Sequence, residues 1–149
     1  MPLARRYREA MEASTVAIVL TSLVLATTAV GLVWQARNGR VRRTENGAVV
    51  AIEGVRLGDR ATLLQFSTEV CAPCRATARV LGELADKTDD VAHVDLDVTH
   101  RPELAARFRV MQTPTTLILD RDGAVRARIG GSVRRDEVAA ELDRVLTAA

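Results

Sequence analysis

The sequence contains only two cysteines, Cys71 and Cys74, and only two histidines, His93 and His100, in 149 residues. A structural zinc site needs four ligands, usually supplied as two closely spaced pairs. The chain has no second pair of cysteines, and its histidines are not spaced like those of a zinc finger. We therefore expect no metal site. Half of a zinc site and a pair of inert buried cysteines are the alternative interpretations of Cys71 and Cys74.

Aromatic residues are also scarce, at 3% of the chain, whereas hydrophobic residues make up 48%. A core can therefore form, but it must consist mainly of valine, leucine, isoleucine and alanine. The 21 basic residues are almost balanced by 19 acidic ones, which leaves a formal net charge of +2. This small excess does not indicate binding to nucleic acid. The length allows one domain of ordinary size and an appendage.

The longest apolar run covers 16–34 and contains no charged residue. As a helix it would be about 28 Å long, close to the hydrocarbon thickness of a bilayer. We interpret it as one transmembrane helix, with Trp34 at the level of the headgroups. A cleaved signal peptide is the alternative, but the run exceeds the usual signal-peptide core and no clear cleavage site follows it. A polar flank (1–15) precedes the helix, and a basic tether (35–47) and a globular domain (48–149) follow it.

This organisation predicts a single-pass protein of the cell membrane, with the lipid bilayer as one partner. Three basic residues precede the apolar run and four follow it closely, so the positive-inside rule does not decide which side carries the domain. The stretch 35–43 contains no acidic residue, which favours a cytoplasmic domain. Two interpretations of its arginines remain open. They contact anionic headgroups, or they act only as a topology signal.

The two cysteines belong to the motif Cys71-Ala72-Pro73-Cys74, which opens a stretch with helical spacing of apolar residues. The two-residue spacing allows the sulfurs to form and break a disulfide without a large backbone movement. A helix N-terminus favours a nearby anion, and this position and the Cys-X-X-Cys spacing both lower the pKa of a thiol. We expect Cys71 to be the nucleophile. We expect Cys74, one turn further into the helix, to resolve the mixed disulfide.

The rest of the domain alternates between strand and helix patterns. Strands are expected, in chain order, at 48–52, 61–67, 91–96, 115–120 and 124–129. Helices are expected from the cysteine motif to about residue 88, over 101–108, and after Ser132, which we expect to cap the last helix. Strands separated by helices imply parallel pairing, and the turn at 121–123 makes the last two strands a hairpin. The pattern predicts an α/β fold with one N-terminal transmembrane helix before it.

Three features together resemble the thioredoxin-fold family, over about residues 48–147. They are the segment FSTEVCAPC after a buried strand, Thr113-Pro114 before the next-to-last strand, and Gly130-Gly131 before the last helix. Pro114 follows Cys71 by 43 residues, which matches the spacing in the family. The resemblance implies a thioredoxin-like fold, a central mixed sheet flanked by helices, in a membrane-anchored thioredoxin domain protein.

The resemblance also implies roles for the residues around the motif. The Thr113-Pro114 bond is expected to be cis, and the backbone of Thr113 is expected to pair with an extended substrate segment beside Cys71. Val70 stands where the family usually has a tryptophan, so it should change the shape of the surface that meets the substrate. We therefore expect Thr113, Pro114 and Val70 to bind substrate.

Two further departures from the family affect proton transfer. Family members that reduce substrates carry a buried acid six residues before the first cysteine, where this chain has Gln65. They place a lysine near that acid, where this chain has His93. Gln65 cannot take a proton from Cys74, so transfer would need water. His93 is either a new proton relay or a histidine that packs or lies at the surface.

The combined prediction is a membrane-anchored thiol-disulfide oxidoreductase that exchanges disulfides with protein substrates. It needs a partner reductase or oxidase and no cofactor besides the Cys71–Cys74 disulfide. Ala72-Pro73 does not set the direction of electron flow. The alternative, which Gln65 and Val70 support, is a redox-inactive, membrane-tethered binding module with the thioredoxin fold.

Overall fold

The computed structural model describes residues 3–37, 40–44 and 47–148. The chain divides into two compact units at residue 37. The first unit is one helix, α1 (Leu3–Arg37). The second is an α/β domain, so the predicted fold class is confirmed.

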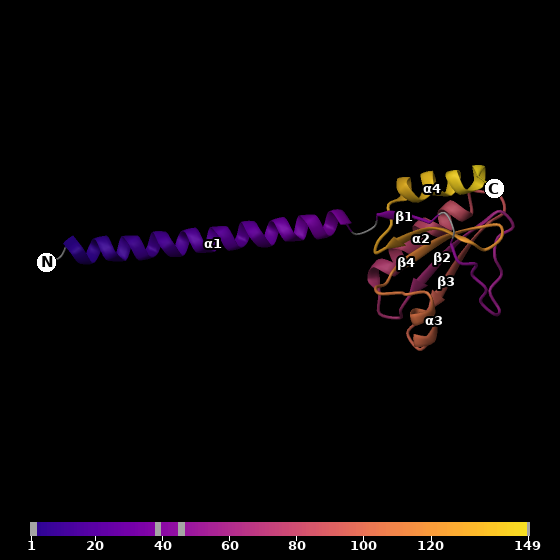
Figure 1. Ribbon diagram of the computed structural model, residues 1–149, viewed down its shortest axis with the longest axis horizontal. Coiled ribbons are helices and arrows are strands. Elements are labelled where there is room, and N and C mark those ends of the chain that lie inside the picture. Colours follow the sequence, from indigo (N-terminus) through magenta and orange to yellow (C-terminus); the bar gives the residue numbers. More distant parts are fainter. Residues whose placement is uncertain (1–2, 38–39, 45–46, 149) are drawn as a thin grey trace. The chain divides into compact units, whose positions relative to one another are not determined.

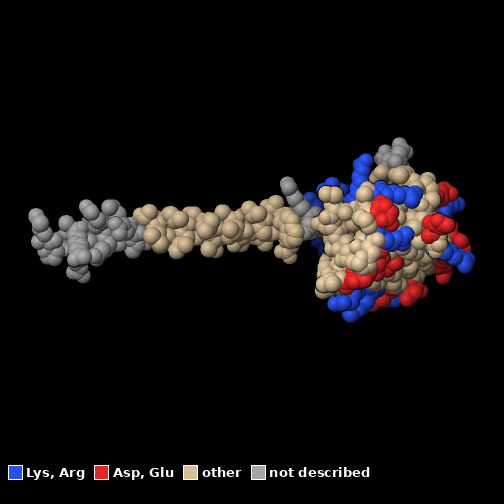
Figure 2. Space-filling model, turned by 90° about the horizontal axis from the view of Figure 1, so that it is seen from below, with Lys and Arg blue, Asp and Glu red and all other residues tan. Residues whose placement is uncertain are grey.

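The helix α1 is longer than the predicted span, because its helical backbone continues through the polar residues on both sides of 16–34. Arginine, glutamate and alanine favour helix as well, so the end of the apolar run does not end the helix. The stretch Ser14–Gln35 is long and apolar enough to cross a membrane, and it lies near the N-terminus, where a signal sequence also lies. Figure 2 shows no Lys, Arg, Asp or Glu over the coloured part of this helix.

Two hydroxyls inside this stretch of α1, those of Thr21 and Thr27, are hydrogen-bonded within the helix. The hydroxyl of Thr21 donates a hydrogen bond to the carbonyl of Ala17 at 2.8 Å, and the hydroxyl of Thr27 donates to that of Leu23 at 2.9 Å. Such bonds within the helix let a hydroxyl enter hydrocarbon without an unpaired donor. Thr21 and Thr27 therefore do not argue against a membrane span.

The domain consists of five strands and three helices in the part of the chain that the structure describes. In chain order they are β1 (Val41–Arg43), β2 (Ala61–Ser67), α2 (Ala72–Ala85), β3 (Val91–Asp97), α3 (Pro102–Arg107), β4 (Thr115–Asp120), β5 (Val125–Gly130) and α4 (Arg135–Thr147). The strands form one sheet in the order β1-β5-β4-β2-β3. The parallel pair β2–β3 and the hairpin β4–β5 are both as predicted.

Helices cover both faces of this sheet, and α3 and α4 lie on opposite sides of it (Figure 1). One buried cluster contains side chains of α2 and α4, such as Leu81 and Leu142, together with Ile118 of the sheet. The other contains Leu104 of α3 and Phe66 and Leu117 of the sheet. Every residue of β2 and β4 is buried, as expected for central strands that are covered on two faces.

The two edges of the sheet differ from each other. The strand β5 pairs along its outer side with β1, and Ala124, just before β5, forms an isolated bridge with Val49. The strand β3 ends the sheet on the other side, and the described residues place no further strand beside it. Its outer side is therefore an open edge.

The first strand is not where the sequence predicted it. Residues 48–52 do not form a strand, and only Val49 makes a bridge, because this segment passes the tip of the β4–β5 hairpin instead of running along a strand. The first strand is β1, inside the predicted tether 35–47. Val41 packs against the buried cluster of α2 and α4, and main-chain pairing with β5 holds the rest. The remaining tether residues 38–39 and 45–46 lie outside the described part.

Two helix boundaries also differ from the prediction. The helix α2 ends at Ala85, three residues before the predicted end. The helix α4 begins at Arg135, and its N-cap residue Arg134 makes no side-chain capping bond, so Ser132 is not the cap. Main-chain bonds and packing fix this start, as the bond from the Val138 amide to the Arg134 carbonyl shows.

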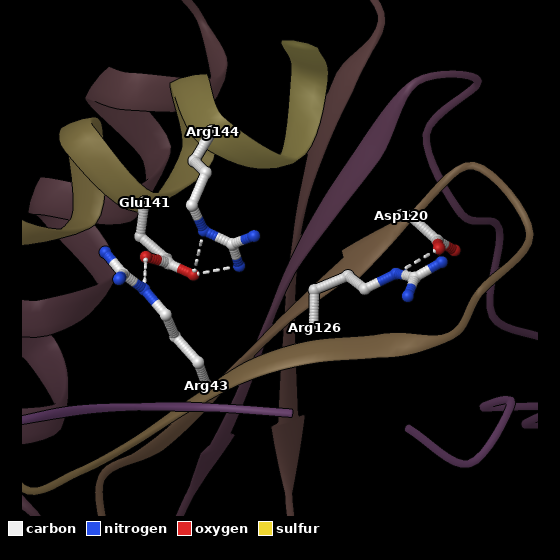
Figure 3. Close-up of polar contacts among 5 residues, drawn as sticks. All are labelled: Arg43, Asp120, Arg126, Glu141 and Arg144. Carbon is white, nitrogen blue, oxygen red and sulfur yellow. Dashed lines mark hydrogen bonds and ion pairs between the residues drawn. The ribbon is translucent and has the colours of Figure 1, made fainter. Parts of the chain in front are cut away.

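A buried carboxylate fastens β1 to α4 (Figure 3). Glu141 is only 2% exposed, and it accepts a hydrogen bond at 2.9 Å from Nε of Arg43 and bonds from Arg144. Burial raises the pKa of Glu141, but the two arginines outweigh this effect and lower it below the usual value of 4.5. The side chain is therefore an ionised group that joins the first strand to the last helix.

Candidate active site

The two cysteines are joined in a disulfide at the start of α2. Cys71 is the N-cap residue, with an extended backbone, and Pro73 lies within the first two positions of the helix. The backbone amide of Cys74 points at Sγ of Cys71, at 3.2 Å. An amide in this position stabilises negative charge on the sulfur once the disulfide is reduced. Both residues are buried, Cys71 at 7% and Cys74 at 3% exposure.

Gln65 lies directly beneath this motif. It is fully buried on β2, and its Nε2 donates a hydrogen bond to the carbonyl of Cys74 at 3.0 Å. Its Oε1 has no hydrogen-bond partner among the described residues, and the same holds for Oγ1 of Thr77 on α2 and Oγ1 of Thr116 on β4. Thr116 is the direct cross-strand neighbour of Gln65. Unpartnered acceptors and hydroxyls on neighbouring elements are where ordered water is normally found in proteins.

The Thr113–Pro114 peptide bond is cis, as predicted. It precedes β4, whose first residue, Thr115, pairs with Phe66 near the end of β2. The cysteine motif follows that same end of β2. The hydroxyls of Thr68 and Thr113 lie 3.3 Å apart and join the two loops. The structure thus brings the proline loop and the cysteine motif to one end of the sheet.

Gly131 fixes the proline loop from the other side. Its amide donates a hydrogen bond to the carbonyl of Pro114 at 2.8 Å. Its φ of +89° lies in a region that other residues rarely adopt, which explains why glycine follows β5. A residue with a side chain at this position would be strained when it points its amide at the carbonyl of Pro114.

Two exposed apolar side chains lie in the loops at this end of the domain. Val70, immediately before the first cysteine, is 98% exposed, and Met111, three residues before Pro114, is 92% exposed. Val70 is thus in contact with solvent beside the disulfide, and its role in substrate binding stays a prediction. Met111 was not predicted, because a single methionine in a loop carries no pattern. Its exposure in the structure is what distinguishes it from a core residue.

His93 lies elsewhere. It pairs with Leu63 on the neighbouring strand, and its Nδ1 lies against Gly82, two turns beyond Cys74 in α2. Burial lowers the pKa of His93 below its usual value of 6.5, while the charges of Asp95 and Asp86 act in the opposite direction. No bond joins His93 to Gln65 or to either cysteine among the contacts of the described residues. The structure therefore supports a half-buried, neutral histidine beside the helix.

Comparison with known proteins identifies this arrangement. The model of the family described as Thioredoxin matches residues 52–144. The chain belongs to the thioredoxin family. Thioredoxin of Mycolicibacterium smegmatis is 34% identical over 112 residues, which cover 69% of this chain and 99% of that protein. Thioredoxin H5 of Oryza sativa subsp. japonica is 32% identical over 81 residues, 54% of this chain and 60% of the relative.

Solved structures show the same relationship. Thioredoxin of Fasciola hepatica superposes with a TM-score of 0.51 and 26% identity, covering 58% of this chain and 82% of that one. Thioredoxins are thiol-disulfide oxidoreductases, and this thioredoxin-family chain carries the cysteine pair that such chemistry requires. The helix α1 lies outside the matched residues 52–144, so the family relationship says nothing about its role.

Proposed function

We propose that this protein is a membrane-anchored thiol-disulfide oxidoreductase, with Cys71 as the nucleophile and Cys74 as the resolving thiol. The observation that carries the proposal is the amide of Cys74 directed at Sγ of Cys71, at the N-terminus of α2. The cis-proline loop at the same end of the sheet supports it. Thr113 offers its backbone to an extended substrate segment, and Val70 supplies an apolar contact.

The reduced protein transfers two electrons to a substrate disulfide in two steps. The Cys71 thiolate attacks one sulfur of the substrate, the substrate S–S bond breaks, and one substrate thiolate leaves while a mixed disulfide forms. Cys74 then loses its proton and attacks Sγ of Cys71. The mixed disulfide breaks, the second substrate thiolate leaves, and the Cys71–Cys74 disulfide found in the structure is formed. The reverse sequence oxidises a substrate dithiol.

Proton removal from Cys74 is the step in which this chain differs from relatives with a buried acid. Gln65 holds the Cys74 carbonyl and has no ionisable group. A water molecule on the unpartnered oxygens of Gln65, Thr77 and Thr116 would accept the proton instead. Gln65 then positions the second cysteine and the water, rather than acting as a base. No metal or organic cofactor takes part in this scheme.

The apolar helix α1 supports the membrane anchor. Its stretch Ser14–Gln35 has the length of a bilayer crossing, and the hydroxyls of Thr21 and Thr27 are hydrogen-bonded within the helix. The absence of acidic residues in 35–43 favours a cytoplasmic domain. In that compartment a partner reductase would keep the cysteines reduced, and the protein would act as a reductase.

The enzymatic part of the proposal is tested with a trapping variant. Cys74→Ser should accumulate mixed disulfides at Cys71 with protein substrates, because the second step is blocked. The Cys71→Ser variant is the matched control, and it should form no adduct by the first step. Wild-type protein should reduce insulin with a thiol reductant as electron source. Absence of both turnover and adducts would instead favour the binding module.

The anchor is tested separately. Extraction of cell membranes with alkaline carbonate should leave the full chain in the pellet, and detergent should release it. A single size on gels, equal to that of the full sequence, should exclude cleavage after α1. Labelling of the reduced cysteines by a membrane-impermeant maleimide should require lysis if the domain is cytoplasmic. Labelling of intact cells would reverse the assigned side.

A further inference from the structure

The strand that enters the domain from α1 begins at the end of the sheet that carries the cysteine motif. Val41, the first residue of β1, pairs with Ile129, which pairs with Thr116, which pairs with Gln65. These four residues form one row across four strands. Gln65 is also the residue whose side chain holds the Cys74 carbonyl. The chain therefore arrives in the same row of the sheet that supports the disulfide.

The strand β1 is fastened, so this entry point is fixed within the domain. Its three residues pair with β5, and the next residue continues the ladder through the Thr44 amide, which donates to the Arg126 carbonyl at 2.8 Å. Arg43 binds the buried Glu141, as Figure 3 shows. Part of the basic tether predicted over 35–47 is therefore strand β1, and only residues 38–40 separate the end of α1 from Val41.

Covalent geometry then limits how far the disulfide can lie from the end of the span. From Gln35 to Val41 the chain reaches at most about 17 Å, whatever conformation the linking residues adopt. The row from Val41 to Gln65 adds about 14 Å, three strand spacings. With the Gln65 side chain included, Cys74 lies within about 40 Å of the end of the span. Entry at the opposite end of the sheet would add about 20 Å, the length of a seven-residue strand.

The charges around this entry point fit an anionic surface. Arg42 and Arg128 face each other directly across β1 and β5. Burial, followed by the charges of Arg109 and Arg42, lowers the pKa of the Arg128 guanidinium. The Arg128 guanidinium donates hydrogen bonds to the carbonyls of Phe108 at 2.8 Å and Arg109 at 2.6 Å, so its charge is held within the domain. Arg40 and Arg42 remain exposed beside the entry point, and anionic lipid headgroups there would attract them at roughly 1 kcal/mol for each basic residue.

We propose that the substrates are membrane-bound proteins whose reacting cysteines, as disulfides or dithiols, lie close to the bilayer surface on the same side as this domain. The proposal rests on the proposed function, and it adds the substrate class. The site works within a shell of about 40 Å next to the bilayer, because a fastened β1 and a short link hold the cysteine motif there. Protein disulfides carried far above the membrane are outside that shell.

The test uses the full chain with the Cys74→Ser substitution, in vesicles of phosphatidylcholine and phosphatidylglycerol. The probes are single-span peptides whose one cysteine forms a disulfide with 2-nitro-5-thiobenzoate, held by helical spacers about 10, 30 or 80 Å from the surface. The Cys71 thiolate attacks the peptide sulfur, the probe S–S bond breaks, and thionitrobenzoate leaves. Its absorbance gives the rate, and gels confirm the adduct.

We expect the probes at about 10 and 30 Å to react at least ten times faster than the probe at about 80 Å, since the distant cysteine has a low effective concentration. The matched control carries a flexible Gly/Ser segment of about 40 residues inserted after Asn38. It keeps the same domain, and the ratio of its rates with the near and the distant probes should fall below three.

Equal rates with all three probes in the chain without the insertion would overturn the inference. A ratio of near to distant rates that the insertion leaves unchanged would also overturn it. A soluble probe, glutathione joined to 2-nitro-5-thiobenzoate, separates this failure from failure of the proposed function. Reaction with the soluble probe shows that Cys71 is an active nucleophile. If neither this probe nor the peptides react, the proposed function is wrong and the substrate class falls with it.

Discussion

Replacement of Glu141 by alanine tests whether β1 is held to the domain by a buried charge. The carboxylate is 2% exposed, with Arg43 at 2.9 Å and Arg144 on the same helix as its partners. The side chains of Arg43 and Arg144 are 68% and 41% exposed, so both guanidinium groups regain water when the carboxylate is removed. The substitution therefore leaves no buried cation without a partner. The cost of roughly 3–5 kcal/mol that is typical of a broken buried ion pair does not apply.

The expected loss follows from the bonds that disappear. A hydrogen bond to a charged group contributes about 1.5–3 kcal/mol when it is buried. Exposure of the arginines reduces each contribution to about 1 kcal/mol. Glu141→Ala should therefore lower the free energy of unfolding by about 2 kcal/mol, and the urea midpoint by about 1–2 M. The matched control Glu83→Gln removes an exposed pair with Arg135 and should hardly change the midpoint.

Pulse proteolysis in urea is a suitable assay, because the domain has no tryptophan or tyrosine and α1 contributes as much helical signal as the three helices of the domain together. The pKa of Glu141 is lowered in the folded state. Its contribution is therefore complete at neutral pH and disappears as the pH falls through the lowered value, so wild type and variant should converge in acid. A loss below about 0.5 kcal/mol, or the same loss in an Arg43→Ala background, would refute the assigned role.

Three further predictions concern groups around the site. The pKa of His93 is lowered in the folded state, so the folded protein resists protonation of this side chain. The free energy of unfolding should therefore fall as the pH drops below 6.5, the pKa of an unfolded histidine. His93→Gln should flatten this pH dependence, which urea titrations at pH 5 and 7 would measure. Gln65→Leu should remove the side-chain hydrogen bond to the Cys74 carbonyl, which keeps its partner within α2, cost about 0.5–1.5 kcal/mol, and slow the resolving step in rapid-quench measurements of mixed-disulfide decay. An unchanged decay rate would contradict the positioning role. Gly131→Ala should cost about 1–3 kcal/mol through strain at positive φ and weaken the bond to Pro114, which amide hydrogen exchange of residue 131 would report.

Sequence patterns predicted the centre of the fold well. The strands β2 and β4 have the predicted boundaries, because a strand covered on both faces is a continuous apolar run. The helix start at Cys71 and the cis bond before Pro114 were also predicted, through motif spacing and family resemblance. These features depend on local residue types, which a sequence displays directly.

The parts that were missed depend on distant partners. The strand β1 has three residues and is held by β5 and by Glu141, nearly 100 positions away, so no local pattern indicates it. The placement of His93 two turns along α2 from Cys74 follows from the register between β2 and β3, which the spacing of residues does not reveal. The exposure of Met111 likewise depends on how its loop is folded.

Under the proposed membrane anchor, the open edge at β3 has a further consequence. Confinement to two dimensions raises the frequency with which copies meet, and an unprotected edge strand invites pairing between them. The border carries Asp95 and Asp97, whose carboxylates are held locally by Ser67 and Thr99. Fixed negative charges along an uncapped border repel an identical border, which favours independent molecules even where the bilayer crowds them together.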